Sequence, residues 1–398
     1  MQKPVLIDVT RLLLRIIKGK NATGVDRVCL AYIDYFSKNA QAILAWKSKV
    51  TVLDKKTSEQ LFYLLLNNPK QKSRNFWIHT LVKSMFLTPN HLGDYEGCFY
   101  FNINHKGLES EEYINKILRL KLIPIFFIHD LIPITHPEFC RAAEKDLHVK
   151  RMLNVLRADG GILVNSAFTQ QQLAAFAEQN QMALPPTEVA WLSCKFLTQQ
   201  SQSQPDEDFI KNLGQNYFVM LSTIEPRKNH LTILHIWREL FEKYKAQTPK
   251  LVLIGQRGWE CEQVIDLLER SPAIRQCLVE IPSASDSRIV DVLKNARALL
   301  FPSYVEGYGL PLVEALYLGV PVLASDIEVF NEIGQQIPEF IHPIDGVSWM
   351  SYIEDYMQPT SEKRALQLKR LAHYQHWEWL QHFECVDALM QKLEQAKK

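Results

Sequence analysis

The sequence lacks any long hydrophobic run. Its longest apolar stretches are residues 12–17, 61–66 and 122–128. All fall well short of the roughly 18 residues that a membrane-spanning helix requires. Charges at Lys3, Asp8, Arg11 and Arg15 lie in and around the first stretch, which a secretory signal peptide would not contain. We therefore expect a cytoplasmic protein without a membrane-spanning segment.

Cysteine is sparse and forms no pattern. The seven cysteines are Cys29, Cys98, Cys140, Cys194, Cys261, Cys277 and Cys385. Their odd number, their wide spacing and the lack of a C-x-x-C pair or Cys/His cluster argue against a disulfide framework and against a structural zinc site. We expect buried thiols instead.

The chain also lacks a strong net charge, because 45 basic and 44 acidic residues give +1. This balance, together with the lack of a known nucleic-acid-binding module, argues against nucleic acid as a partner. The charge is uneven, with about +7 in residues 1–190 and about −6 in residues 191–398. The two halves are therefore expected to face different partners.

What the chain has is a globular composition, with 47% hydrophobic and 22% charged residues. At about 150 residues per domain, its length suits two domains. Residues 199–208 (QQSQSQPDED) contain no hydrophobic residue, which is typical of a linker. We place the domain boundary there, with one domain in residues 1–200 and the next beginning at residue 209.

Short apolar runs alternate with helical patterns in both halves. Strands are predicted at 5–9, 98–101, 123–128, 161–164, 217–221, 251–254, 278–281, 298–301 and 320–323, and helices at 231–244 and 260–269. This alternation predicts an α/β protein made of two Rossmann-like, doubly wound parallel-sheet domains. Ligands of such sheets bind at the carboxyl ends of the strands, so we expect an interdomain cleft.

The strongest local signal lies in residues 301–316, where an apolar strand runs into a glycine-containing turn and Pro311 opens a helix. Gly307 and Gly309 allow the backbone to approach a ligand closely, and the helix N-terminus favours phosphate. The carboxylates of Glu306 and Glu314 would repel phosphate, so we expect them to accept hydrogen bonds from hydroxyls at the two ends of a diphosphate. A tight turn with a solvated Glu314 explains this segment equally well.

A second anion site is predicted in residues 221–230, where another strand end leads into a helix. Arg227 and Lys228 lie where cations and helix N–H groups could meet a dianion together, with charge-assisted hydrogen bonds of roughly 1.5 to 3 kcal/mol each. A solvated basic pair is the alternative. Two anion sites on one sheet favour the first interpretation.

In the first half, His129 and Asp130 end the apolar strand at 125–128. Buried strands rarely end in two ionisable groups, so His129 is a candidate site residue, with a satisfied core histidine as the alternative. Residues 22–28 open a helix with a glycine turn at Gly24 that could reach the same cleft, although that motif is weak by itself.

In this order, these segments resemble the glycosyltransferases of the GT-B fold, specifically the large retaining family 4 (glycosyl transferases group 1) that builds bacterial polysaccharides and glycolipids. The matching segments are 7–11, 23–27, 128–133, 225–229, 251–259 and 306–314. They span almost the whole chain, whereas residues 47–95 match no known pattern. The resemblance implies an acceptor domain in residues 1–200, a donor domain in 209–372 and a terminal helix in 373–398 that crosses back to the acceptor domain.

The resemblance also implies roles for single residues. Glu306 would contact hydroxyls of the donor sugar, Glu314 would hold the nucleotide ribose, and Arg227 and Lys228 would neutralise the leaving diphosphate. Gly307, Tyr308, Gly309 and Leu310 would offer backbone amides to the sugar and diphosphate, and Ile281 and Pro282 would meet the base largely through backbone groups. Gly24 would keep the loop of the first domain clear of the phosphates, and Thr223 is also assigned to the donor site. His129 would touch the transferred sugar near its reacting face.

One departure from the family concerns Ser222 and Thr223, which stand where many relatives have Gly-Arg or Gly-Thr. A phosphate-contacting arginine found in some members is therefore missing, and Arg227 and Lys228 would carry more of the load. The acidic triplet 206–208 imitates a metal-binding D-x-D but lies in the linker. We expect neither a metal nor a cofactor.

The predicted activity is retaining transfer of a hexosyl group, mannose being favoured, from a nucleotide diphosphate sugar to a growing surface glycan such as a capsule or lipopolysaccharide. GDP is favoured slightly over UDP. The alternatives are a catalytically silent sugar-nucleotide-binding subunit and a GT-B epimerase. A phosphorylase would need a cofactor lysine that the sequence does not reveal.

Residues 60–90 suggest a peripheral membrane contact. Basic and aromatic residues interleave there, namely Phe62, Tyr63, Lys70, Lys72, Arg74, Phe76, Trp77, Lys83 and Phe86. They could rest on an anionic membrane surface and receive a lipid-linked acceptor. A solvated helical hairpin explains them equally well.

Overall fold

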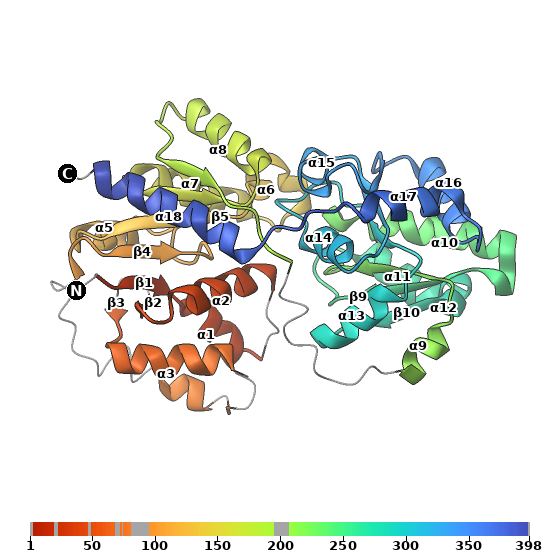
Figure 1. Ribbon diagram of the computed structural model, residues 1–398, viewed down its shortest axis with the longest axis horizontal. Coiled ribbons are helices and arrows are strands. Elements are labelled where there is room, and N and C mark those ends of the chain that lie inside the picture. Colours follow the sequence, from red (N-terminus) through yellow and green to blue (C-terminus); the bar gives the residue numbers. More distant parts are fainter. Residues whose placement is uncertain are drawn as a thin grey trace. The chain divides into compact units, whose positions relative to one another are not determined.

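The computed structural model describes residues 3–19, 23–46, 49–67, 72–73, 75–80, 95–194 and 207–396 (Figure 1). The chain divides into two compact units. The first contains residues 1–134, 143–192 and 379–398, and the second contains residues 135–142 and 193–378. Of the boundaries predicted at residues 200 and 209, the first lies in the stretch 195–206, outside the described residues, and the second lies among the described residues of the second unit.

The first unit is built on a seven-stranded sheet in the order β3-β2-β1-β4-β5-β6-β7. Its strands are β1 (Val5–Asp8), β2 (Ala40–Trp46), β3 (Lys49–Val52), β4 (Phe99–Asn102), β5 (Ile123–Ile128), β6 (Gly161–Val164) and β7 (Thr187–Val189). All neighbours pair in parallel except β2 and β3, which are antiparallel. The antiparallel edge pair was not among the strands predicted from the sequence, and the predicted strands of this unit are parallel to their neighbours in the sheet.

Helices cover this sheet on both faces (Figure 1). They are α1 (Thr10–Ile17), α2 (Gly24–Phe36), α3 (Lys55–Leu66), α5 (Glu111–Arg119), α6 (Ile132–Thr135), α7 (Glu144–Arg157) and α8 (Ala167–Gln179). Every residue of β1, β4, β5 and β6 is buried, as expected of strands covered on both faces. Their polar groups of interest consequently lie at the strand ends.

The C-terminal helix α18 (Trp379–Ala396) packs on the first unit, along β6 and β7 (Figure 1). Gly161 makes room for it, since an added Cβ would lie 2.7 Å from Leu393 Cδ1. The ring of Phe383 stacks on that of Tyr35 with centroids 3.8 Å apart. The helix therefore belongs to the core of this unit, whereas residues 373–378 belong to the second unit.

The second unit has a six-stranded sheet in the order β10-β9-β8-β11-β12-β13, with parallel pairing throughout. Its strands are β8 (Tyr217–Leu221), β9 (Lys250–Ile254), β10 (Leu278–Ile281), β11 (Leu299–Phe301), β12 (Val322–Ser325) and β13 (Glu339–Ile341). This is a doubly wound sheet: the chain adds strands outward on one side of β8 and then on the other, so the topological switch point lies between β8 and β11. The carboxyl ends of those two strands are thus the expected ligand position.

The helices of the second unit are α9 (Glu207–Leu213), α10 (His230–Tyr244), α11 (Glu262–Arg270), α12 (Pro272–Cys277), α13 (Asp286–Lys294), α14 (Leu310–Tyr317), α15 (Glu328–Gly334), α16 (Gly346–Tyr356) and α17 (Glu362–Leu371). Short 3₁₀ turns occur at Pro137–Phe139, Pro226–Lys228 and Lys245–Gln247.

All nine strands predicted from the sequence are present within one or two residues at their ends. The fold class is therefore confirmed, while β2, β3, β7 and β13 went unpredicted.

Two predictions concern the membrane: that the chain has no membrane-spanning segment, and that residues 60–90 contact a membrane surface. No helix of the described ranges is both long and apolar enough to cross a bilayer. Phe62 and Trp77 are buried in the first unit, so the prediction that they contact a membrane was wrong. Their ring surfaces pack in the core, where burial is worth more than partial insertion. Lys70, Arg74, Lys83 and Phe86 lie outside the described residues.

Candidate functional site

The loop after β11 places Glu306 at the carboxyl end of the second sheet. Gly309, with φ +123°, caps α14, and an added Cβ there would lie 2.8 Å from Phe330 Cε1. Only glycine fits this conformation and this space. Pro311 follows in the first turn of the helix, as predicted. The turn is therefore fixed by its sequence, and it holds Glu306 at 6% exposure.

Glu306 gathers two cations from the loop after β8. Arg227 Nη1 donates to Glu306 Oε2 at 2.5 Å, and Lys228 Nζ donates to Oε1. Ser303 Oγ adds a further bond to Oε1 at 2.8 Å. Burial acts to raise the pKa of Glu306, but the charges of Arg227 and Lys228 outweigh it and lower the pKa to about 2. Glu306 is therefore ionised at neutral pH.

Arg227 and Lys228 are held in place rather than solvated. Arg227 Nη2 contacts Glu225 Oε1 at 2.7 Å, and its Nη1 also donates to the carbonyl of Val305 at 3.2 Å. Lys228 is 8% exposed, and its Nζ lies 5.3 Å from the centre of the Phe301 ring. Burial lowers the pKa of Lys228. The alternative of a solvated basic pair is thereby excluded.

Asn229 connects the loops around this cluster, although the sequence analysis assigned it no role of its own within the segment 225–229. It has φ +56°, a left-handed conformation that asparagine tolerates. Its Nδ2 donates to the carbonyls of Pro302 at 3.1 Å and Pro343 at 2.8 Å. These bonds tie the loops after β8, β11 and β13 together and so fix the distance between Lys228 and Glu306.

Glu225 and Ser303 are further polar residues of the cluster that the sequence did not reveal. Both are buried, and burial raises the pKa of Glu225. With Arg227, Lys228 and Glu306, they form a group of two carboxylates and two cations that is close to neutral overall. Their own contacts are local, Glu225 with Arg227 and Ser303 with Glu306. They join one cluster because Arg227 and Lys228 pair with Glu306, which is 79 and 78 residues away.

The remaining predicted donor-site residues lie on the same strand ends and loops. Glu314 is buried on α14, which excludes the interpretation of a solvated helix residue. Ile281 ends β10 and is buried, whereas Pro282 and Thr223 are exposed. Gly307, Tyr308 and Leu310 follow Glu306, the first two buried and Leu310 partly exposed. The ligand contacts assigned to all of these residues stay predictions.

The loop after β9 packs directly on the loop after β8. Gly255 has φ +150°, and an added Cβ would lie 2.0 Å from the carbonyl oxygen of Ser222. At Gly258, an added Cβ would lie 2.6 Å from the carbonyl oxygen of Ile224 and 3.0 Å from Thr223 Cγ2. Both glycines thus permit a close approach of two backbones beside Arg227 and Lys228.

Replacing Gly255 with alanine should lower the free energy of unfolding by about 3 kcal/mol or more, because the new methyl group overlaps a backbone atom that cannot move freely. Urea unfolding of the purified variant measures this change. Gly346→Ala is the matched control, since no atom lies within 4 Å of its added Cβ and its φ is not positive. Equal stability of the two variants would contradict the packing described here.

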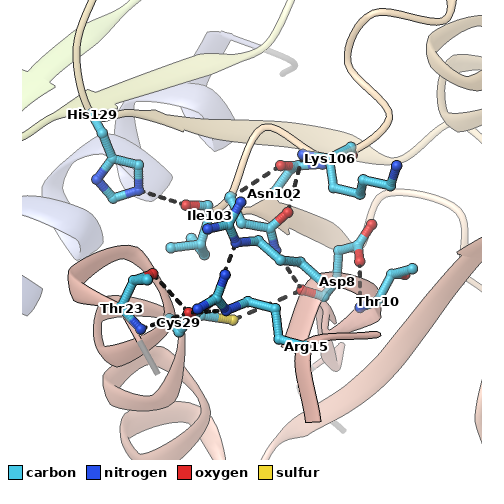
Figure 2. Close-up of polar contacts among 12 residues, drawn as sticks. Asp8, Thr10, Arg15, Thr23, Cys29, Asn102, Ile103, Lys106 and His129 are labelled. Carbon is cyan, nitrogen blue, oxygen red and sulfur yellow. Dashed lines mark hydrogen bonds and ion pairs between the residues drawn. The ribbon is translucent and has the colours of Figure 1, made fainter. Parts of the chain in front are cut away.

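His129 ends β5 in the first unit, with its side chain turned toward the end of β4 (Figure 2). His129 Nε2 lies 2.7 Å from the carbonyl oxygen of Ile103, and its own carbonyl accepts a bond from Asn165 Nδ2 at 2.9 Å. A carbonyl only accepts, so Nε2 carries the proton and Nδ1 is left as an acceptor. Burial lowers the pKa of His129 to about 4, so the ring is neutral near pH 7.

Two more histidines, His105 and His148, surround His129 and were not predicted. The ring centres of His105 and His129 lie 5.5 Å apart, as do those of His105 and His148. Burial lowers the pKa of both added histidines. Nothing in the sequence links them, because they come from the β4–α5 loop and from α7. In the described ranges, no group of three His, Cys, Asp or Glu residues is arranged to hold a metal ion.

The N-terminus of α2 lies near this site and carries a network centred on Asp26. Arg11 Nε and Arg15 Nε approach its carboxylate at 3.1 and 2.7 Å, and the backbone N–H of Thr23 donates to it at 2.7 Å. Thr23 caps the helix that Gly24 begins, as Figure 2 shows in part. This capping box fixes the start of α2 at Gly24, where the sequence predicted that a helix opens. The role of Gly24 in keeping this loop clear of the donor phosphates stays a prediction.

Buried Asp8 lies at the end of β1, beside Thr10 (Figure 2). Tyr113 Oη donates to its Oδ2 at 2.8 Å, and Tyr100 Oη approaches at 3.4 Å. Burial raises the pKa of Asp8. These contacts explain the Asp in the 7–11 segment as a structural anchor for the ends of β1 and β4.

The buried histidines predict how stability depends on pH. Burial lowers the pKa values of His129 and His382 to about 4, below the ordinary value of 6.5. Between these pH values the unfolded chain binds protons that the folded chain does not, so stability falls as the pH falls from 6.5 towards 4. We expect urea unfolding to show a steady loss of stability from pH 7 to pH 5. A flat profile would contradict the burial of these rings.

Comparison with known proteins shows which family part of the chain matches. Residues 202–336 match the family model of glycosyl transferases group 1. The matched segment lies within the second unit of the chain. Two Escherichia coli proteins are similar to the chain: the serotype-specific mannosyltransferase WbdA is 28% identical over 60% of the chain, and the O-antigen chain mannosyltransferase B is 26% identical over 63%. The aligned parts make up 31% and 65% of those proteins, so the chain spans less than two thirds of their length.

The solved structures that resemble the chain show its fold. The trehalose 6-phosphate synthase of Burkholderia multivorans superimposes with a TM-score of 0.63, at 11% identity, with full coverage of both chains. At this identity the similarity shows the architecture alone. The GT-B fold expected from the sequence motifs is confirmed, as is the resemblance to the group 1 family.

Proposed function

We propose that this protein is a glycosyltransferase that transfers a mannosyl group from a nucleotide diphosphate sugar. The acceptor is a hydroxyl of a growing surface glycan or lipid-linked saccharide, and the configuration at the anomeric carbon is retained. The observation that carries the proposal is the buried cluster in which Glu306 pairs with both Arg227 and Lys228. This cluster lies at the topological switch point between β8 and β11. Two desolvated cations at that position suit a diphosphate leaving group.

In the proposed reaction, departure of the nucleoside diphosphate builds negative charge on its phosphate oxygens. Arg227 and Lys228 stabilise that charge in a site with little water, where a fixed cation is most effective. Glu306, freed from part of its pairing, accepts hydrogen bonds from the hydroxyls of the sugar. Glu314 does the same for the ribose. Neither a metal ion nor a cofactor has a role in this scheme.

His129 is proposed to contact the transferred sugar. Its Nε2–H is used by the carbonyl of Ile103, so Nδ1 is the nitrogen that can accept a hydrogen bond from a sugar hydroxyl. Because the ring is neutral near pH 7, it does not repel the positive character that develops at the anomeric carbon. No carboxylate is assigned as a covalent nucleophile, which favours attack on the same face that the diphosphate leaves.

The choice of mannose and of an O-antigen-like acceptor follows from the relatives, which are named as a serotype-specific mannosyltransferase and an O-antigen chain mannosyltransferase. GDP is our proposed nucleotide, with UDP the main alternative. We propose the cytoplasmic face of the membrane as the site of action.

The first test is thermal stability of the protein with GDP, UDP, ADP, dTDP and CMP, each with and without EDTA. A ligand at about 100 times its Kd stabilises by roughly 2.7 kcal/mol, which shifts the melting temperature measurably. We expect a shift with GDP that survives EDTA, followed by release of GDP from GDP-mannose when an acceptor is added. Binding without turnover on any acceptor would favour a silent subunit, and no binding would contradict the proposal.

A membrane contact of the first unit is also proposed. A groove of about 420 Å³ is lined by Glu59, Gln60, Tyr63, Leu64, Lys72 and Phe76. Tyr63 is 66% exposed and Phe76 37%, with Lys72 Nζ 5.5 Å from the ring centre of Phe76. Exposed aromatic rings beside a lysine suit an anionic lipid surface. Flotation that does not depend on the anionic lipid content of the liposomes would contradict this contact.

A further inference from the structure

Residues 135–142 pack with the second unit, although the chain on both sides of them belongs to the first. The ring of Phe139 stacks on that of Tyr304, with centroids 5.3 Å apart and planes 1° from parallel. The guanidinium of Arg141 lies 5.0 Å from the centre of the Trp259 ring. The segment therefore rests on two loops at the carboxyl ends of β9 and β11.

The loop that carries Trp259 is held firmly on its neighbours. The N–H of Gly255 donates to the carbonyl of Ile281 at 3.0 Å, and that of Gly258 donates to the carbonyl of Ile224 at 2.9 Å. Arg257 makes two bonds of 2.9 Å to the carboxylate of Glu280 on β10. The loop that leads to Trp259 is thus held on the end of β10 at Gly255 and Arg257 and on the loop after β8 at Gly258. Ile281, which accepts the first of these bonds, is one of the residues expected to meet the nucleotide base.

Arg141 and Trp259 both retain hydrogen-bond donors without a partner. The indole Nε1 of Trp259 is buried and has no hydrogen-bond partner. Among the described residues, Arg141 has no hydrogen bond or ion pair. Its one side-chain interaction there is the contact of its guanidinium with the Trp259 ring. The indole covers one face of the guanidinium and leaves its in-plane N–H groups available. A buried donor without a partner is unfavourable, and a ligand acceptor would satisfy it.

We propose that Arg141 and Trp259 form the base subsite of the donor nucleotide and that Arg141 selects guanine. Guanine has two adjacent acceptors, O6 and N7, on one edge, and they match two parallel N–H groups of a guanidinium. Adenine presents an amino group beside N7 and uracil a C–H beside O4, so neither offers this pair. The inference rests on the proposed function, because it places a nucleotide donor on the same loops.

The test is calorimetric titration of the full chain with GDP, UDP and inorganic pyrophosphate. Arg141→Ala should weaken GDP binding by about 10- to 100-fold while the Kd for pyrophosphate stays the same, since only the base contact is lost. Arg141→Lys should not restore GDP binding, because an ammonium cannot make the paired contact. Arg270→Ala is the matched control, as Arg270 is an exposed residue of the same unit that pairs with Asp266.

The outcomes separate this inference from the proposed function. If the wild type binds GDP and Arg141→Ala binds it equally well, the base subsite is wrong and the donor site stands. If the wild type prefers UDP, guanine selection by Arg141 is wrong. If the folded wild type binds no nucleoside diphosphate, the proposed function itself fails. A loss of GDP affinity equal to that in Arg270→Ala would show a general charge effect and would also overturn the inference.

Discussion

Replacing Lys228 with alanine is expected to lower the rate of sugar transfer by about 100-fold, by analogy with the loss of one donor to a developing negative charge. Lys228 is almost fully buried, and its ammonium meets Glu306 directly. Its removal leaves Arg227 as the single cation of the cluster. The turnover number, measured from nucleoside diphosphate release at saturating donor, is the quantity that should fall.

Lys211→Ala provides the control for this variant. Lys211 is an exposed lysine of the same unit that pairs with Glu207 on α9. Its loss removes the same charge without touching the cluster, so its turnover should match the wild type. Because removal of Lys228 also leaves Glu306 with one cation fewer, the melting temperature must be recorded and the assay run below it. If the Lys228→Ala protein is folded and has wild-type turnover, the assignment of the diphosphate site is wrong.

Glu306→Gln should move binding and catalysis in opposite directions. The carboxylate of Glu306 competes with a diphosphate for Arg227 and Lys228, since it already holds both cations. Glutamine keeps the size of the side chain and removes its charge, so nucleoside diphosphate without sugar should bind about tenfold more tightly, a gain of about 1.4 kcal/mol. Transfer should nevertheless fall by about 100-fold, because the contact to the sugar hydroxyls is weakened.

Calorimetry with GDP and a turnover assay on the same preparation measure both effects. The matched control is Glu262→Gln, at an exposed glutamate in the first turn of α11. It should change neither quantity. Weaker binding in Glu306→Gln would mean that the carboxylate supports the anion site rather than competing with it, and the proposed sharing of the two cations would then be wrong.

The parts of the site that the sequence predicted are those with a local cause. Gly309 and Pro311 define a turn followed by a helix within three residues, and the apolar strand before them ends at Phe301. Arg227 and Lys228 likewise follow a strand end and precede a helix. In each case the backbone requirement and the chemistry lie in one short segment, which a reader of the sequence can recognise.

The residues that the sequence did not reveal act through distant contacts. Asn229 reaches carbonyls 73 and 114 residues away, and His105 lies beside His129 and His148 only because β4, β5 and α7 pack together. The same limit explains the error at Phe62 and Trp77. An aromatic residue in a basic segment suits a membrane surface or a protein core, and packing with the rest of the unit decides between them.

By itself, then, the sequence determined the strand and helix alternation, the two doubly wound sheets and the positions of the glycine turns, because each depends on local periodicity and backbone freedom. The tertiary structure alone decided that Glu306 binds both Arg227 and Lys228, that Asn229 joins three loops, and that residues 135–142 pack with the second unit. These are contacts between segments far apart in the chain. Their energy arises only when the parallel strands bring their carboxyl ends to one edge of the sheet.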